Sequence, residues 1–197
     1  MSPIEEMFLF LAPGSDAATD RVTFEHDGAR TLLVWAPDAA AAAGVAREQA
    51  DNGIKLIELY RGFDLAAAAG VIEAVDGRVP VGVAGTIGAT TPAASRDSVT
   101  IYEGEHVEPV VHTNADGSRT VVVGASGTDA AVDAATTYVR EGAGLVEICG
   151  GTKLGTAAAV SSALDGTAAV TLVSWPLDSI RGAAAYNIAW EESQASA

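Results

Sequence analysis

The sequence predicts an α/β protein built from two tandem copies of one small domain. Three observations lead to this prediction: an internal repeat at an offset of 89 positions, continuous apolar runs of strand length, and alanine-rich stretches between them. Hydrophobic residues make up 49% of the 197 positions, which is enough to bury a core, so a disordered chain is excluded.

The repeat is clearest where turns and charged residues coincide. Residues 27–34 (DGARTLLV) recur as 116–123 (DGSRTVVV), and 53–59 (GIKLIEL) align with 142–148 (GAGLVEI). From 22 to 86, about 22 of 65 aligned positions are identical, and many of the matches are not alanine. Because 89 residues form a whole small domain, we expect two homologous domains packed about a pseudo-twofold axis as a fused dimer.

In the first copy, strands are predicted at apolar runs and helices where alanine dominates. Asp27-Gly28 indicates a turn before the long apolar strand, Asp38 is the expected N-cap residue of the next helix, and Gly53 suits the left-handed position after that helix. The predicted order is strands 8–11, 22–24 and 31–36, a helix from 38 to about 53, strand 56–59, helix 65–75, and strand 79–84.

The second copy repeats the order β-β-α-β-α-β. Thr128 is the expected N-cap residue of its first helix, and Gly142 ends that helix. The predicted elements are strands 99–102, 110–112 and 120–125, a helix from 128 to about 142, strand 145–148, helix 154–164, and strand 169–173. Strands joined by helices indicate mostly parallel sheets with right-handed crossovers.

The two copies define the expected domain boundaries. These are a first repeat over 1–86, a linker rich in small and turn-forming residues over 87–98, a second repeat over 99–175, and a tail over 176–197. The tail has no counterpart in the first copy. We expect a short helix over 180–186, packing on the body through 187–190, and fraying beyond 191.

Charge and cysteine content limit the expected partners. The net charge is -15, so the surface repels nucleic acid and anionic membranes. A single cysteine, with no segment that resembles a signal peptide or a membrane span, points to the cytoplasm. No histidine or cysteine spacing fits a metal site, so we expect neither metal nor cofactor. The expected partner is a small molecule, and a homodimer stays open.

The segments around the central strands resemble a known family. The first copy reads LIELYRGF over 56–63 and VPVGV over 79–83, and the second reads LVEICGG over 145–151. Together they resemble the I-E-L-C-G-G-F … P-V-G-V pattern of an uncharacterised family of short bacterial α/β domains, a domain of unknown function. Residues 8–13 (FLFLAP) are similar to that family's opening. The resemblance implies the fold and no activity.

Glu58 and Glu147 are the first candidate catalytic residues. Each lies within an apolar strand, where a carboxyl group must be hydrogen-bonded, paired or protonated. Burial is how proteins tune a carboxyl group to act as a general acid or base near neutral pH. The alternative is a structural glutamate held by backbone N–H groups or by arginine. Cys149 is a candidate nucleophile at a strand end, or else a small buried side chain.

Ligands of open parallel sheets bind at the carboxyl ends of the strands. That rule selects as candidate binding residues Trp35, Tyr60 and Arg61 in the first copy, and Ser126, Gly150, Gly151, Thr152, Lys153 and Trp175 in the second. Residues 150–153 could cradle an anion at a helix start or form an ordinary tight turn. The bases Arg61 and Lys153 could bind a carboxylate or phosphate, or form ion pairs.

Side-chain size differs between the copies at matched positions. The aligned pairs are Trp35 with Gly124, Tyr60 with Cys149, and Arg61 with Gly150. We therefore expect bulky side chains to fill the first site, and the second to be hollow there and closed by Trp175. One main pocket should result, in the second copy or shared between the two.

These residues lead to two hypotheses about function. The first is a cofactor-independent enzyme of the isomerase, cyclase or lyase type, which moves a proton on a small organic molecule. Glu147 would be the acid/base, Cys149 and Trp175 would shape the pocket, and Glu58 would be a second acid/base or a structural residue. The second is a non-catalytic ligand-binding or assembly module, in which both glutamates only brace the core.

Overall fold

The computed structural model of the protein describes residues 3–26, 29–87, 96–105 and 108–195. The expected Asp27-Gly28 turn and most of the expected linker lie outside the described residues. The chain forms two compact units, one made of Met1–Val83 with Ser174–Ala197 and the other of Ala84–Val173. Each unit contains one copy of the repeat.

The first copy has the predicted order of strands and helices. Its elements are β1 (Glu6–Leu11), β2 (Arg21–His26), β3 (Ala29–Ala36), α1 (Ala39–Asp51), β4 (Leu56–Leu59), α2 (Leu65–Val75) and β5 (Val81–Ile87). The strands lie in the order β2-β3-β1-β4-β5. Strand β1 pairs in parallel with β3 and β4, β4 pairs in parallel with β5, and β2 pairs antiparallel with β3, so the prediction of a mostly parallel sheet is confirmed.

The second copy has the same arrangement. Its elements are β6 (Ser98–Glu103), β7 (Val110–Thr113), β8 (Arg119–Ala125), α3 (Thr128–Arg140), β9 (Leu145–Ile148), α4 (Leu154–Leu164) and β10 (Ala169–Ser174). Its strands lie in the order β7-β8-β6-β9-β10, and β7 is antiparallel to β8. The shared order in both copies confirms an α/β fold with an internal duplication.

The helices of the two copies begin differently. In the first copy the side chains of Asp38 and Asp64 cap α1 and α2, each accepting a hydrogen bond of 2.8 Å from a backbone N–H of the first turn. In the second copy the N-cap residues of α3 and α4 are Gly127 and Lys153, and neither helix has a side-chain cap. The prediction that Thr128 caps α3 is wrong, because Thr128 is already the first helical residue.

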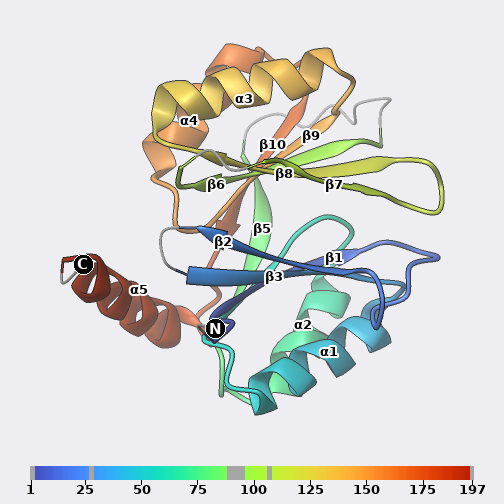
Figure 1. Ribbon diagram of the computed structural model, residues 1–197, viewed down its shortest axis with the longest axis vertical. Coiled ribbons are helices and arrows are strands. Elements are labelled where there is room, and N and C mark those ends of the chain that lie inside the picture. The colour runs from blue at the N-terminus through green and yellow to red at the C-terminus, as the bar shows by residue number, and fades with distance from the viewer. Residues whose placement is uncertain (1–2, 27–28, 88–95, 106–107, 196–197) are drawn as a thin grey trace. The chain divides into compact units, whose positions relative to one another are not determined.

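The strands of each copy carry two helices on one face, and Figure 1 shows α1 and α2 together and α3 and α4 together. Apolar side chains from that face and from the helices form one core in each copy, which includes Leu9 and Ile57 in the first and Ile101 and Val146 in the second. Because side chains alternate along a strand, the residues between these point to the opposite face. That opposite face carries the two glutamates of interest.

The tail forms a longer helix than the sequence indicated. Helix α5 (Ile180–Ala195) has 16 residues and continues past Glu191, so the prediction of a short helix followed by frayed residues is wrong. Of the segment expected to pack on the body, Trp190 is half-buried, whereas residues 187–189 are exposed.

The tail packs on the first copy. The Ser179 hydroxyl accepts a hydrogen bond of 2.9 Å from the backbone N–H of Val81. One turn into α5, a side chain added at Gly182 would meet the ring of Pro80 at 3.1 Å, so the helix lies close to that loop. Further along, the Tyr186 hydroxyl donates a hydrogen bond of 2.5 Å to the Glu6 carboxylate. The tail therefore belongs to the compact unit of the first repeat.

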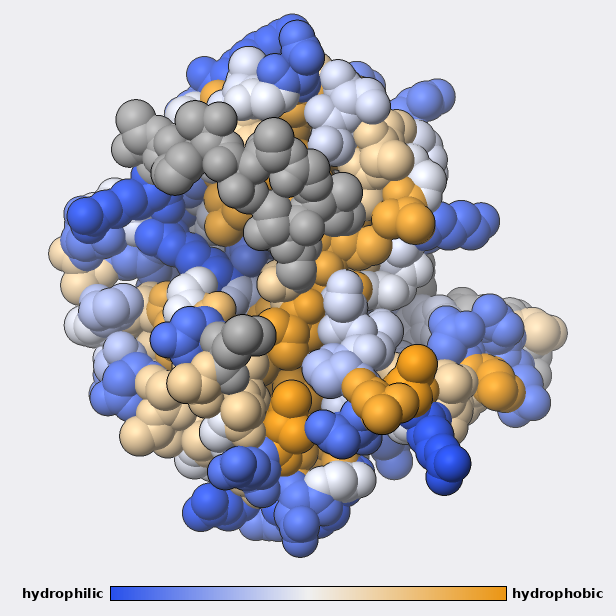
Figure 2. Space-filling model, turned by 180° about the vertical axis from the view of Figure 1, so that it is seen from behind, coloured by the Kyte–Doolittle hydropathy of each residue, from blue (hydrophilic) through white to orange (hydrophobic). Residues whose placement is uncertain are grey.

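Large hydrophobic side chains also lie at the surface. They include Leu154, Leu177, Ile180 and Ile188, each at least half exposed. Figure 2 shows hydrophobic surface among hydrophilic patches on the face seen from behind. No helix in the described ranges is both long enough and apolar enough to span a bilayer.

Candidate functional site

The two strand glutamates lie at matched positions, and both are buried. Glu58 of β4 is 0% exposed and Glu147 of β9 is 1% exposed. Their side chains point away from the helices, because the preceding residues, Ile57 and Val146, lie in the helix-side cores. Each copy thus carries a fully buried glutamate at this strand position, and its neighbours determine what it can do.

In the first copy an aromatic cluster surrounds Glu58. The hydroxyl of Tyr60 donates a hydrogen bond to the Glu58 carboxylate. The Tyr60 ring lies 5.1 Å from the ring of Phe8 and 5.4 Å from that of Phe10, and Phe10 stacks on Trp35 at 5.2 Å. All five side chains are buried. This arrangement favours a bracing role for Glu58.

The second copy is compared with the first through the register of the strands. Glu6 of β1 pairs with Thr31, and Ser98 of β6 pairs with Thr120, which is the repeat partner of Thr31. Strands β1 and β6 therefore correspond at an offset of 92, whereas the rest of the repeat keeps 89. This shift of three positions changes which side chains are equivalent.

Around Glu147 the aromatic cluster gives way to smaller and more polar side chains. Thr100 and Thr171 pair with Glu147 on the two neighbouring strands, at the positions that Phe8 and Gly82 hold in the first copy. The other exchanges are Phe10 to Tyr102, Trp35 to Gly124, and Tyr60 to Cys149. The tyrosine that braces the first glutamate is thus replaced by cysteine, and hydroxyl groups flank the second.

On this face of the second copy, several hydroxyl groups are buried without a partner among the described residues. The side-chain oxygens of Ser98, Thr100 and Thr120 make no hydrogen bond within the described part of the chain. In the first copy the positions of Ser98 and Thr120 are held by Glu6 and Thr31, which are hydrogen-bonded to each other at 3.1 Å. Because buried polar groups nearly always have a partner, the second copy carries unused hydrogen-bonding capacity beside Glu147.

The prediction of a hollow at Gly124 is wrong. A Cβ atom at this position would lie 2.9 Å from the Tyr102 hydroxyl and 2.5 Å from the carbonyl oxygen of Glu105. The tyrosine ring and a backbone segment therefore occupy the space that Trp35 fills in the first copy. Glycine is needed here for close packing and opens no cavity.

The segment that follows Glu147 forms a tight turn at the strand end. The N–H of Cys149 donates to the Ile101 carbonyl at 2.9 Å, and the N–H of Thr152 donates to the Cys149 carbonyl at 3.0 Å. Cys149 and Gly150 are half-buried, whereas Gly151 and Lys153 are exposed. Solvent therefore reaches the carboxyl end of β9.

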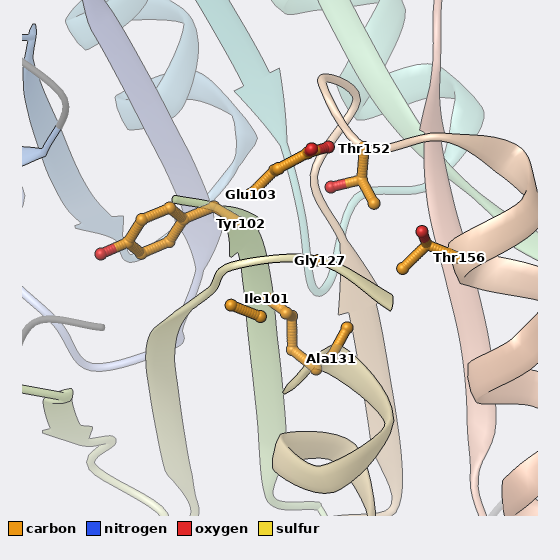
Figure 3. A pocket seen from close by; sticks show the side chains of 8 residues that line it. Ile101, Tyr102, Glu103, Gly127, Ala131, Thr152 and Thr156 are labelled. Atoms are coloured by element: carbon orange, nitrogen blue, oxygen red, sulfur yellow. The ribbon is translucent and has the colours of Figure 1, made fainter. Parts of the chain in front are cut away.

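A pocket opens at the carboxyl ends of β6 and β8, beside the first turns of α3 and α4 (Figure 3). It contains about 190 Å³ of space that no protein atom fills, part of it open to solvent. Its apolar part includes Ile101, Ala125 and Ala131, and its polar side chains are those of Glu103, Thr152 and Thr156, whereas the Tyr102 ring points away from them (Figure 3). Because this space includes open solvent, the enclosed part is far smaller and holds about one water molecule, so a larger group would lie partly in solvent.

Comparison with known proteins adds the family. One family profile, that of a family of unknown function called DUF6506, matches the chain twice, over residues 4–94 and 97–187. The chain belongs to DUF6506. The tandem matches confirm both the internal duplication and the resemblance drawn from the strand motifs. No curated protein and no solved structure matches the chain.

The two DUF6506 repeats divide the predicted site residues. The first unit contains Trp35, Glu58, Tyr60 and Arg61. It also contains Trp175, because the chain from Ser174 onward belongs to this unit. The second unit contains Ser126, Glu147, Cys149, Gly150, Gly151, Thr152 and Lys153. Ser126 is exposed between β8 and α3, and Thr152 lines the pocket.

Sequence reasoning missed several polar residues of the second DUF6506 repeat. Thr100 and Thr171 flank Glu147, and Glu103 and Thr156 line the pocket. Aligning the first strands of the two repeats by their polar-apolar alternation, with a shift of three positions, would have drawn attention to Thr100.

The clearest electrostatic feature lies in the first DUF6506 repeat. Glu6 accepts hydrogen bonds from Thr31 and Tyr186, and His26 lies 3.8 Å from its carboxylate. Burial opposes ionisation and would raise the pKa of Glu6, but hydrogen bonds from His26, Tyr186 and Thr31 and the charge of His26 outweigh it and lower the pKa. Glu6 is thus held as a carboxylate that ties α5 to the sheet.

The described residues contain no cluster of side chains that could bind a metal ion. Over residues 3–26, 29–87, 96–105 and 108–195, no three histidine, cysteine, aspartate or glutamate side chains converge on a point.

Proposed function

We propose that the second repeat catalyses proton transfer on a small organic molecule without a cofactor, as an isomerase, cyclase or lyase. One observation supports the proposal above all. Both repeats keep a buried strand glutamate, but the tyrosine that braces Glu58 is replaced by Cys149 beside Glu147, and the strand neighbour Phe8 is replaced by Thr100. A change in surroundings around an unchanged carboxyl group is expected when one copy is structural and the other functional.

Glu147 is the proposed acid/base. Its carboxylate would take a proton from a carbon atom next to a substrate carbonyl group, and the resulting acid would return the proton to the same or another atom. The Thr100 hydroxyl, beside Glu147 and without a partner among the described residues, would donate a hydrogen bond to the substrate oxygen on which negative charge develops. The half-buried Cys149 would shape the approach at the strand end.

A second candidate function is non-catalytic binding of a small ligand, or assembly. The hydrogen bond between Tyr60 and Glu58 favours it for the first repeat, because that glutamate is satisfied within the aromatic cluster. In the second repeat the same unpartnered hydroxyl groups would hold a ligand without chemistry.

The setting of the proposed enzyme follows from composition. An acidic chain with one cysteine suits a cytoplasmic protein that acts on a small molecule, without nucleic acid or membrane as a partner. The chain could act alone or as a homodimer.

Solvent exchange tests the proposed chemistry. The protein is incubated in D₂O with a set of small 2-oxo acids, 3-oxo acids and enolisable ketones, and deuterium incorporation is followed by NMR. Proton abstraction from carbon replaces a C–H by a C–D bond, so at least one compound should exchange faster with protein than without. Glu147→Gln should slow that exchange by about 100-fold or more, the usual contribution of a general base.

Two results decide between the candidates. A compound that binds in a thermal shift measurement but does not exchange supports the binding module. Exchange that persists unchanged in Glu147→Gln contradicts the role of Glu147, and absence of exchange over the whole set counts against the enzyme. Thr100→Val should have a smaller effect than Glu147→Gln. It should slow exchange by about tenfold, because one hydrogen bond to the negative charge on the substrate oxygen is lost.

A further inference from the structure

We propose that the pocket between the first turns of α3 and α4 binds a small oxyanion, namely a carboxylate or phosphate group, with the Thr152 hydroxyl as a hydrogen-bond donor. The pocket lies on the helix side of the second sheet, because Ile101 and Ala131 of the helix-side core line it. Glu147 points to the opposite face, so this proposal stands apart from the proposed proton transfer.

The helix starts supply the first argument. The first N–H groups of a helix lack partners within the helix and carry partial positive charge, so they bind carboxylates and other anions. In the first repeat the carboxylates of Asp38 and Asp64 fill this role for α1 and α2. Their matched residues in the second repeat are Gly127, which has no side chain to cap α3, and Lys153, whose side chain does not cap α4. The second repeat has therefore lost two built-in anions at the place where its pocket opens.

Thr152 supplies the second and independent argument. The residue is 9% exposed, and its hydroxyl oxygen makes no hydrogen bond to any described residue. Figure 3 shows this hydroxyl pointing into the pocket from the turn before α4. A buried hydroxyl group without a partner costs free energy, and a bound oxyanion would accept its hydrogen bond.

The neighbouring threonines fix the geometry of the site. The hydroxyl oxygens of Thr128 on α3 and Thr156 on α4 are 2.8 Å apart and hydrogen-bonded. This bond ties the two helix starts together, so both can face one ligand. Helices α3 and α4 have 13 and 11 residues, so each has a complete first turn whose N–H groups carry partial positive charge.

Charge around the pocket limits the ligand. Lys153 is exposed at the start of α4 and adds a positive charge. Glu103 is exposed and lines the pocket, and Figure 3 shows its carboxylate directed toward the space beside Thr152. Its repulsion favours a singly charged group such as a carboxylate over a doubly charged phosphate, and it keeps the affinity low.

Amide NMR tests the proposal. Sodium acetate and inorganic phosphate are titrated separately into ¹⁵N-labelled protein at constant ionic strength, with chloride as the balancing anion. We expect saturable shifts of amides in the first turns of α3 and α4, with acetate bound more tightly than phosphate. The first turns of α1 and α2, which carry their own aspartate caps, serve as the internal control and should not shift.

Variants isolate the contributions of single groups. Thr152→Val removes the hydroxyl at nearly constant volume and should weaken binding about tenfold, whereas Thr152→Ser keeps the donor and should bind as wild type does. Lys153→Asp gives α4 the cap that Asp64 gives α2, and it should abolish binding while the protein stays folded. Glu103→Gln removes the repulsion and should tighten binding two- to threefold.

The proposal is overturned by any of three results: no saturable shift with either anion, equal affinity in Thr152→Val and wild type, or equal shifts at the capped helices. A failure of this kind leaves the deuterium exchange experiment unaffected, since the residues proposed for proton transfer, Glu147 and Thr100, lie on the opposite face.

Discussion

Replacing Tyr60 by phenylalanine tests whether Glu58 braces the first repeat. The Tyr60 hydroxyl is buried and donates to the carboxylate of Glu58, which is fully buried. Phenylalanine keeps the ring and hence the packing on Phe8 and Phe10, at 5.1 and 5.4 Å. The variant therefore removes the hydrogen bond to Glu58 and keeps the packing of the ring.

The expected loss of stability follows from that single bond. A hydrogen bond to a neutral carboxyl group contributes about 1 kcal/mol, and one to a carboxylate about 1.5 to 3 kcal/mol. For a chain of this length, each kcal/mol lowers the melting temperature by about 2 to 4 °C. We therefore expect Tyr60→Phe to lower the free energy of unfolding by about 1 to 3 kcal/mol and the melting temperature by about 2 to 12 °C.

Tryptophan fluorescence in urea is the suitable assay. All three tryptophans, Trp35, Trp175 and Trp190, lie in the compact unit of the first repeat, so their signal follows its unfolding. Tyr138→Phe is the matched control, because Tyr138 lies on α3 in the other unit and its variant should leave the transition in place. A loss below about 0.5 kcal/mol in Tyr60→Phe, the range of ordinary surface substitutions, would refute the bracing role.

Two further predictions concern the tail and the helix caps. The pKa of Glu6 is lowered in the folded protein, so its contribution to the free energy of unfolding is present above the ordinary glutamate pKa and is lost as the pH falls through the folded value. Acid titration of the wild-type protein should show this loss. Tyr186→Phe removes one hydrogen bond to Glu6, so it should reduce the part of the unfolding free energy that depends on pH. Asp64→Ala should cost about 0.5 to 2 kcal/mol because it removes the α2 cap, whereas Lys153→Ala, at the uncapped start of α4, should change the unfolding free energy little. Urea unfolding followed by circular dichroism measures both cap variants, and equal losses would contradict the difference between the repeats.

Much of the fold could be predicted because local signals and long-range packing agree. The second strand-helix pair of each repeat begins and ends where the sequence indicates, over Leu56–Leu59 and Leu65–Val75 in the first copy. The reason is that apolar runs there are bounded by strong stop signals: Asp76 and Asp165 adopt left-handed φ angles of 50° and 46°, and glycine follows each.

Other features depend on tertiary contacts that no local pattern reveals. Helix α5 extends past Glu191 after Tyr186 has anchored it to Glu6, a residue 180 positions earlier in the chain. At Gly124 the alignment shows a lost side chain, but only the fold shows that Tyr102 fills the space. The surroundings of Glu147 depend on a strand register that differs by three positions from the rest of the repeat.

The central claim is that one glutamate serves function and its duplicate serves structure. The most direct test compares Glu147→Gln and Glu58→Gln in two measurements on the same samples, the rate of deuterium incorporation into the exchanging compound and the free energy of unfolding. We predict that Glu147→Gln lowers the exchange rate by about 100-fold and stays folded, whereas Glu58→Gln loses stability and, below its unfolding transition, keeps the rate. The opposite pattern, with exchange lost in Glu58→Gln and retained in Glu147→Gln, would contradict the account.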